Sequence, residues 1–360
     1  MERINVTKSF LPPQEEYQNY LSKIWDTSWL TNNGPLVVEL ESKISNYLDE
    51  KYFAFLGNGT IALQIAIKAL DLSGEIITTP FSYCATTTSI LWENLKPVFV
   101  DINPLDFNIN ADLIEAAITE NTSAILATHV YGNPCEVEKI ETIAKKHNLK
   151  VIYDAAHAFG VKYKGKSLLS YGDISTCSFH STKVFHTVEG GSIICHSQEL
   201  FDKIKLLRSF GHILDDYYLA GINGKNSEFH AAMGLCNLNH LGNIIEGRKA
   251  IFRLYDKLLN WDNLYKPTEK DNNLEYNFAY YPVVFDNDKV TKEVILKLNA
   301  ENIYPRRYFY PSLNKLSYIE DIDECPISES VSTRVLSLPL YPDLDPEIVA
   351  KICKIINSTI

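Results

Sequence analysis

The sequence predicts an α/β protein in which a large domain with a mostly parallel sheet is followed by a smaller α+β domain. Two observations carry this prediction. Between residues 52 and 196, short apolar runs alternate with helical patterns at the spacing of crossover units, whose strands lie parallel. After about residue 250 the chain has Asn-, Asp- and Pro-rich joints between shorter elements. A chain of 360 residues is long enough for about two domains.

The composition excludes several classes of partner. With 34 basic and 45 acidic residues the net charge is −11, so nucleic acid and anionic membrane surfaces are not expected partners. Apolar runs long enough for a membrane span and an N-terminal signal peptide are both missing, which predicts a cytoplasmic protein. Seven scattered cysteines without a C-x-x-C pair indicate reduced thiols rather than disulfides or a zinc site.

The N-terminal segment, residues 1–50, is expected to pack on the large domain. An amphipathic pattern predicts a helix over 14–26, and Trp29 to Pro35 is expected to be an irregular loop. A second helix is predicted over 39–48, with Leu40, Ile44 and Tyr47 on one face.

The large domain is predicted to occupy residues 51–245, and the small C-terminal domain residues 246–360. Ligands of such sheets bind beyond the carboxyl ends of the strands, so residues at those ends are candidates for a site. Apolar runs predict strands at 52–56, 75–79, 97–102, 123–130, 150–154, 192–196 and 280–285, and helical patterns predict helices at about 60–69, 83–94, 136–147, 199–209 and 227–248.

The stretch SFHSTKVFHTVEGG, residues 178–191, places Lys183 in a turn between two apolar runs. Lysine is strongly hydrated, so a lysine here either reaches outward to solvent or has its charge suppressed for chemistry. A neutral lysine amine can attack a carbonyl and form a Schiff base. The stretch by itself does not decide between these alternatives.

Two further strand ends carry polar groups. The turn Gly57-Asn58-Gly59-Thr60 precedes a helix and can aim backbone amides at a phosphate, although tight glycine turns also begin helices for structural reasons alone. Asp154 ends the apolar run Val151-Ile152-Tyr153. A buried carboxylate needs a partner, such as a protonated ring nitrogen, or else Asp154 caps the next turn.

Aromatic and imidazole side chains near these ends leave two interpretations open. Tyr83 could lie on a flat cofactor or be part of the core. The spacing of His157, His180 and His186 matches no zinc motif, so we expect no metal and interpret them as structural or as neighbours of a cofactor.

Together these residues resemble the DegT/StrS family of nucleotide-sugar aminotransferases. The resemblance covers nearly the whole chain, through Trp29-Leu30-Thr31, the Gly57 turn, Thr79 to Tyr83, Asp154-Ala155-Ala156-His157, SFHSTK-x5-EGG and Gly221-Ile222-Asn223. It implies the aspartate-aminotransferase fold, fold type I, with residues 51–245 binding pyridoxal 5′-phosphate, which alternates with pyridoxamine 5′-phosphate.

The resemblance also implies roles for individual residues. Lys183 would be the Schiff-base lysine, Asp154 the partner of the pyridine nitrogen and Tyr83 a ring that stacks on it. Gly59, Thr60 and Ser178 would hold the phosphate, and Asn223 would reach the phosphate of the neighbouring subunit in a homodimer. Two departures from the family are His157, where Gln is usual near the phenolic oxygen, and Lys225, where Arg is frequent. Relatives that dehydrate sugars have histidine in place of the lysine, so Lys183 favours transamination.

Finer similarities suggest the substrate. SFH-x-TK followed by EGG resembles family members that aminate a 4-keto carbon, and INVTK with WLTNNGPL resembles enzymes that make dTDP-4-amino-4,6-dideoxyglucose. The implied reaction moves the amino group of L-glutamate to dTDP-4-keto-6-deoxy-D-glucose for a surface polysaccharide such as the O-antigen of lipopolysaccharide. Amination of a 3-keto sugar and a non-catalytic sensor remain alternatives. Candidates for substrate contacts are Trp29, His186, Arg306 and Tyr308, with Arg307 and Tyr310 nearby.

Overall fold

The computed structural model describes residues 3–268, 273–320 and 323–360. Its helices are α1 (Gln14–Thr27), α2 (Pro35–Leu48), α3 (Gly59–Ala69), α4 (Cys84–Trp92), α5 (Ala111–Ile114), α6 (Val137–His147), α7 (Gln198–Leu207), α8 (Glu228–Leu258), α9 (Asp288–Ala300), α10 (Pro326–Arg334) and α11 (Pro346–Asn357). Short 3-10 turns are η1 (Glu115–Ala117), η2 (Val130–Gly132), η3 (Leu168–Ser170) and η4 (Leu313–Lys315).

Strands gather mainly in one sheet. They are β1 (Ile4–Asn5), β2 (Tyr52–Leu56), β3 (Glu75–Thr78), β4 (Lys96–Phe99), β5 (Thr122–Thr128), β6 (Lys150–Asp154), β7 (Lys162–Tyr163), β8 (Lys166–Ser167), β9 (Ile174–Ser178), β10 (Gly191–Cys195), β11 (His212–Ile213), β12 (Asp216–Tyr217), β13 (Leu264–Tyr265), β14 (Leu274–Glu275), β15 (Tyr281–Phe285), β16 (Ile303–Tyr304) and β17 (Val335–Leu338). Each predicted strand forms, within a few residues of its predicted ends.

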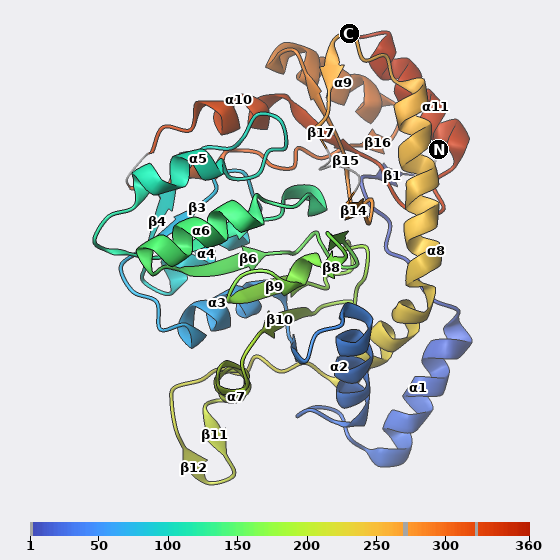
Figure 1. Ribbon diagram of the computed structural model, residues 1–360. Helices are drawn as coiled ribbons and strands as arrows, with labels where there is room; N and C mark the ends of the chain where they lie inside the picture. The colour runs from blue at the N-terminus through green and yellow to red at the C-terminus, as the bar shows by residue number, and fades with distance from the viewer. Residues whose placement is uncertain (1–2, 269–272, 321–322) are drawn as a thin grey trace.

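The central sheet has seven strands in the order β2-β10-β9-β6-β5-β3-β4 (Figure 1). β3, β4, β5, β6 and β9 pair in parallel, while β10 runs antiparallel to both β2 and β9. Buried apolar side chains of α3 and α7 cover one face, and those of α2, α6 and α8 contribute to the core on the other. Coverage of both faces explains why these strands are apolar throughout rather than alternating. The predicted fold class, α/β with a mostly parallel sheet, is confirmed.

The N-terminal segment contacts both parts of the molecule. Helices α1 and α2 pack against α8, while β1 pairs with β16 in the C-terminal third. Helix α2 begins at Pro35, four residues before the predicted start. The reason is tertiary, because the Glu228 carboxylate accepts the amides of Leu36 and Val37 at 2.7 and 2.9 Å and caps the helix from a distant part of the chain.

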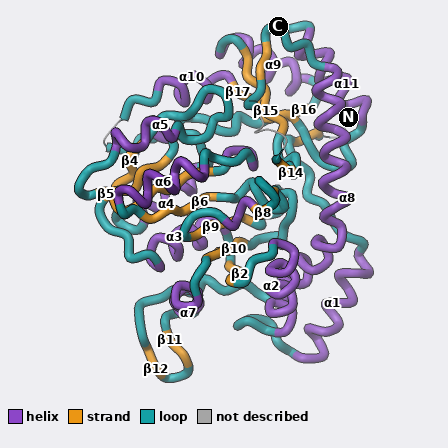
Figure 2. The backbone as a smooth tube through the Cα atoms, viewed as in Figure 1, coloured by secondary structure: helices purple, strands orange, loops and turns teal. Residues whose placement is uncertain are grey.

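The C-terminal third has a second apolar core, formed mainly by β13, β15, β17, α9 and α11 against the C-terminal half of α8 (Figures 1 and 2). Helix α8 is continuous over 31 residues and passes through the proposed boundary at residue 246. Helix α8 thus joins the two cores. The domain boundary at residue 246 stays a prediction.

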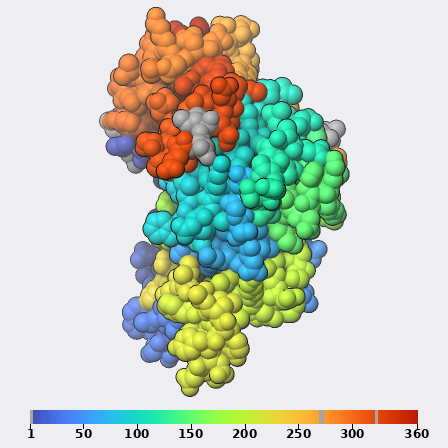
Figure 3. Space-filling view, turned by 90° about the vertical axis from the view of Figure 1, so that its left-hand side faces the viewer, coloured from blue at the N-terminus to red at the C-terminus, as the bar shows by residue number. Residues whose placement is uncertain are grey.

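Helix α7 leads into a small hairpin, β11–β12, that projects from the end of the molecule opposite the C-terminal third (Figures 2 and 3). Its Leu214 and Tyr217 side chains are 86% and 77% exposed. All seven cysteines are free, and six of them are buried. Among the helices that the structure describes, none is both long enough and apolar enough for a membrane span.

Candidate active site

Four strand ends meet at one edge of the central sheet. β2, β6 and β9 end there, and β10 begins there, since Gly191 pairs with both Leu56 and Ser178. Asp154 pairs with Thr176 on β9. The sheet register therefore brings the Gly57 turn, Asp154 and the Lys183 turn to one place.

A cavity of about 290 Å³ opens at this edge. It is lined by nine of the twelve residues predicted from the sequence: Gly59, Thr60, Tyr83, Asp154, His157, Ser178, Lys183, Arg306 and Tyr308. The first seven lie between β2 and β10 in the chain, and Arg306 and Tyr308 come from the C-terminal third.

The structure does not bring the other three predicted residues to this cavity. His186 lies in the interior, where Nε2 is 2.7 Å from the carbonyl oxygen of Phe10 and Nδ1 accepts the amide of Val188. Both ring nitrogens are thus engaged within the protein. The Trp29 indole donates to the carbonyl of Thr31 and is 49% exposed. Asn223 is exposed on the loop before α8, and its predicted contact with a neighbouring subunit stays a prediction.

The N-terminus of α3 forms one wall of the cavity. Asn58 caps it by accepting the amide of Ile61, and the first amides of a helix have no partners inside the helix. Two glycines allow the close packing here. A Cβ at Gly59 would lie 2.9 Å from the Ser178 Cβ, and one at Gly191 would lie 2.4 Å from the backbone of Asn58. The turn is therefore pressed against the ends of β9 and β10, next to the Ser178 hydroxyl.

Asp154 lies at the floor of the cavity and is 5% exposed. Its Oδ2 accepts from the Thr86 hydroxyl at 2.7 Å, and its Oδ1 accepts the amide of Ala156 at 3.1 Å. The Thr86 hydroxyl has one proton and donates it to Asp154, so in its contact with Ser82 it must accept. The Ser82 hydroxyl therefore donates to Thr86 and accepts from Thr128. Burial raises the pKa of this carboxyl, although Thr86, Ala156 and Lys183 each favour the charged form.

Lys183 lines the cavity and donates to the Tyr280 hydroxyl at 3.4 Å. Burial by itself lowers the pKa of the amine, but the interactions with Tyr280 and Asp154 outweigh it, and the pKa lies above its usual value. The sequence left open whether Lys183 reaches solvent or has its charge suppressed. Suppression of the charge does not hold for the protein without its cofactor, because the raised pKa keeps the amine protonated. The sequence of the turn alone gives no indication of Tyr280 and Asp154, the two neighbours that outweigh the effect of burial.

His157 is buried and its backbone carbonyl and ring are both fixed. Burial and the charge of Lys183 hold the pKa of the imidazole well below its usual value, so the ring is neutral. Nδ1 accepts the amide of Tyr131 at 3.2 Å, which leaves the proton on Nε2. The ring stacks on Phe309 with centroids 5.6 Å apart. His157 can therefore donate one hydrogen bond.

Side chains from the C-terminal third complete the cavity. Arg306 and Tyr308 line it, whereas the Arg307 guanidinium turns onto the Tyr310 ring, 3.6 Å from its centroid. Arg306 places a positive charge at the exposed end of the cavity. In the described ranges, no group of three or more His, Cys, Asp or Glu side chains could hold a metal ion.

Two site residues were missed from the sequence. Thr86 follows Tyr83 by one helical turn, so helical spacing could have identified it as a neighbour of the site. Tyr280 precedes β15 and lies 97 positions from Lys183, and no local signal links the two.

The described residues fit pyridoxal phosphate. A tightly packed helix N-terminus beside a serine hydroxyl suits a phosphate, and the buried Asp154, whose pKa is raised, gains from a cationic ring N–H. A lysine lines the same cavity as these two features. The fold and this cavity define a pyridoxal-phosphate-dependent aminotransferase of fold type I.

Comparison with known proteins identifies the family. The chain belongs to the DegT/DnrJ/EryC1/StrS aminotransferase family, whose model matches residues 13–357. It is 42% identical to dTDP-4-amino-4,6-dideoxy-D-glucose transaminase of Shigella dysenteriae, over 99% of this chain and 98% of that protein. It is also 42% identical to the transaminase of the same name in Escherichia coli, over 98% of each.

A solved structure supports the same conclusion. The crystal structure of DesI in the presence of its TDP-sugar product matches with a TM-score of 0.94 and 29% identity, covering 99% of this chain and 93% of that one. The predictions of the family, of fold type I, of the cofactor and of an aminotransferase are confirmed.

Proposed function

We propose that this protein transfers the amino group of L-glutamate to the 4-keto carbon of dTDP-4-keto-6-deoxy-D-glucose and so makes dTDP-4-amino-4,6-dideoxy-D-glucose. The observation that carries the proposal is the meeting of Lys183 and Asp154 in one cavity. Full-length similarity to two transaminases named for this amino sugar supports the choice of substrate. Supply of an amino sugar for surface polysaccharide, such as O-antigen, is part of the proposal.

When bound, pyridoxal phosphate supplies an aldehyde that forms a Schiff base with an amine and a ring that accepts an electron pair. Lys183 Nζ takes the proton from the α-carbon of glutamate and, in the second half of the reaction, delivers a proton to the sugar carbon that receives nitrogen. Asp154 supplies the negative charge that keeps a proton on the ring nitrogen. The products are 2-oxoglutarate and the amino sugar.

The other lining residues bind and orient. The first amides of α3, with Thr60 and Ser178, are arranged to bind a phosphate. His157 Nε2 carries a proton and would donate it in a hydrogen bond to the phenolic oxygen of the cofactor. Arg306, at the exposed end, is suited to the diphosphate of the nucleotide, because a guanidinium binds phosphate oxygens in pairs.

We further propose a homodimer in which Asn223 completes the phosphate site of the neighbouring subunit. Support comes from the exposure of Asn223 and of the apolar side chains on the adjacent β11–β12 hairpin. Mixed refolding of Lys183→Ala and Asn223→Ala chains tests this, since a mixed dimer would hold one intact site. Activity above the sum of the two separate variants is expected, and strict additivity would contradict a shared site.

The reaction is tested by incubating the protein with glutamate and a panel of 3-keto and 4-keto nucleotide sugars, followed by NMR of the product. We expect amination at C4 of the dTDP-linked 6-deoxy sugar. Amination at C3 would identify a 3-aminotransferase. If glutamate converted the cofactor but no sugar product formed, the sugars of this panel would be excluded as substrates. If glutamate did not change the cofactor, the protein would be a non-catalytic sensor.

A further inference from the structure

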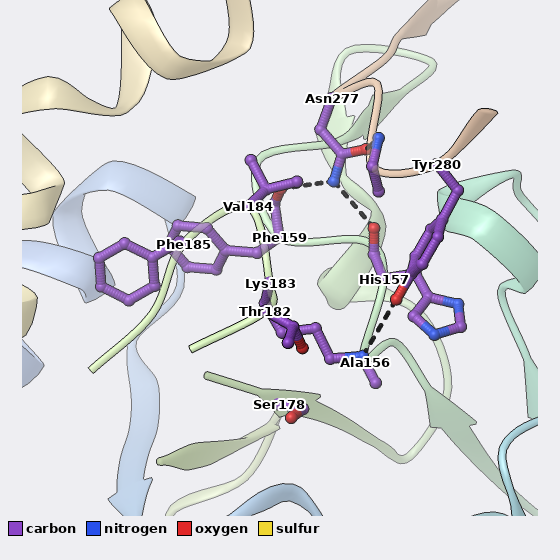
Figure 4. A pocket seen from close by; sticks show the side chains of 11 residues that line it. Ala156, His157, Phe159, Ser178, Thr182, Lys183, Val184, Phe185, Asn277 and Tyr280 are labelled. Carbon is purple, nitrogen blue, oxygen red and sulfur yellow. Dashed lines mark hydrogen bonds between the residues drawn. The ribbon is translucent and has the colours of Figure 1, made fainter. Parts of the chain in front are cut away.

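A second, smaller cavity also borders Lys183. Its volume is about 10 Å³, and Figure 4 shows Lys183 reaching across it toward Tyr280. Lys183, Tyr280 and His157 line both this cavity and the larger one. The side chains of Lys183 and Tyr280 therefore border both spaces.

Tyr280 is fixed from several sides. The side chain is 8% exposed, and its ring meets the edges of His157 and Tyr308 with centroids 4.8 and 5.7 Å apart. The backbone before it is also anchored, because the Asn277 amide donates to the carbonyls of His157 and Phe159 and its oxygen accepts the amide of Ala279. A phenol held this firmly can define the position of a flexible partner.

The flexible partner is Lys183, which has four rotatable side-chain bonds and an amine 3.4 Å from the Tyr280 hydroxyl. The other titratable groups facing this amine are Asp154, Cys177, His157 and Tyr308, and the Tyr308 hydroxyl is engaged by Arg306. Asp154 is already engaged by Thr86 and Ala156, Cys177 donates to a carbonyl, and His157 Nδ1 accepts an amide. Tyr280 is therefore well placed to accept a hydrogen bond from the amine.

We infer that Tyr280 is the positioning residue for Lys183, whose amine it holds by a hydrogen bond whenever that amine is not covalently engaged. The inference rests on the proposed transamination, in which Lys183 must be freed to carry a proton. A hydroxyl that accepts from the ammonium stabilises the protonated amine and keeps it beside the cavity, rather than letting it turn toward solvent.

The test compares wild type with Tyr280→Phe, which keeps the ring contacts and removes the hydroxyl. In cofactor-free protein, the rate at which an amine-reactive label modifies Lys183 is measured across pH, with peptide mapping. We expect the midpoint of this profile to fall in Tyr280→Phe, so that labelling near neutral pH rises roughly tenfold, the effect of one hydrogen bond to a charged group. An unchanged midpoint would overturn the inference.

A second readout uses the cofactor-loaded protein. Tyr280→Phe should lower kcat for the glutamate half-reaction with little change in KM or in cofactor affinity, and Tyr280→His, which restores an acceptor, should recover part of kcat. Tyr255→Phe is the matched control, because that buried hydroxyl donates to the carbonyl of Pro339 in the C-terminal core. If Tyr255→Phe reproduced both effects, the loss would reflect stability alone.

These results separate the inference from the proposed function. A wild-type protein that aminates no sugar would defeat the proposed function, yet the labelling profile would still report on the contact between Tyr280 and Lys183. Active wild type with an unaltered Tyr280→Phe profile would defeat the inference alone.

Discussion

The inner and outer walls of the cavity differ in origin and in burial. The inner wall, defined here as Asp154, His157 and Lys183, follows two neighbouring strands of the sheet and has both charged groups within 29 positions of each other in the sequence. The outer wall, defined as Arg306 and Tyr308, comes from a loop of the C-terminal third and is more exposed.

This difference indicates that the inner wall serves proton transfer and the outer wall serves substrate binding. Sheet register and buried hydrogen bonds fix the inner wall, so it can hold charged groups at the positions that proton transfer needs. The outer wall lies on a loop with Arg306 exposed to solvent, where it can meet substrates of different shape. We expect substitutions in the inner wall to affect kcat and those in the outer wall to affect KM.

The largest expected effect is that of Lys183→Ala. Loss of the amine removes the group that moves the proton, so the rate of amino transfer should fall by roughly 10²- to 10⁴-fold or more. Borohydride reduction and peptide mapping should attach the cofactor to Lys183 in wild type and leave the variant unlabelled. Circular dichroism controls for folding. Wild-type turnover in the variant would show that another group is the base.

Asp154→Asn should reduce turnover by about 10²-fold while the protein still binds cofactor, because an amide supplies no charge to keep the ring nitrogen protonated. The free energy of unfolding of the cofactor-free protein should not fall with the activity in this variant. Burial raises the pKa of Asp154 above its usual 3.8, so the folded state loses stability as pH rises from 3.8 through that raised value.

The cofactor-free Asn variant should therefore be at least as stable as wild type at neutral pH, as measured by denaturant unfolding. Asp173→Asn is the control, because that carboxylate accepts the amide of Val151 at the opposite end of the same strands. A marked loss of stability in Asp154→Asn would show that the carboxylate stabilises the fold rather than serving the site.

Arg306→Ala should raise KM for the nucleotide sugar by about tenfold and leave kcat and KM for glutamate nearly unchanged, since one charge-assisted contact to the diphosphate is lost. Steady-state kinetics with each substrate varied measures this. Arg307→Ala is the matched control, because its guanidinium lies on the Tyr310 ring instead of lining the cavity. Equal effects of the two substitutions would remove the proposed role of Arg306.

The smallest expected effect is on the pH dependence of stability. The pKa of His157 in the folded state lies well below 6.5, so stability is lost as pH falls below 6.5, where the unfolded chain takes up a proton that the folded protein refuses. Between about pH 7.5 and pH 5.5 this amounts to about 1.4 kcal/mol. Over the same pH range, the free energy of unfolding of His157→Gln should fall by about that much less than the free energy of wild type, as denaturant unfolding would measure. His196→Gln, at an exposed position, should follow wild type.

Local patterns predicted the elements of the large domain well. Strands such as Tyr52–Leu56 and Lys150–Asp154 were found because uninterrupted apolar runs mark strands that are covered on both faces. Helix α2 was predicted to begin late, because its cap is the carboxylate of Glu228, which no local pattern can reveal. His186 was assigned to the substrate although its ring is engaged inside the core.

The sequence by itself determined the principal charged and phosphate-facing groups of the site. Lys183, Asp154 and the Gly57 turn follow the ends of β9, β6 and β2, which run in the same direction, so their carboxyl ends lie at one edge of the sheet. The tertiary structure alone decided the state of those groups and their partners. Whether Lys183 is charged depends on Tyr280 and Asp154, and Tyr280 lies 97 positions away in the sequence, because electrostatic and packing forces act through space rather than along the chain.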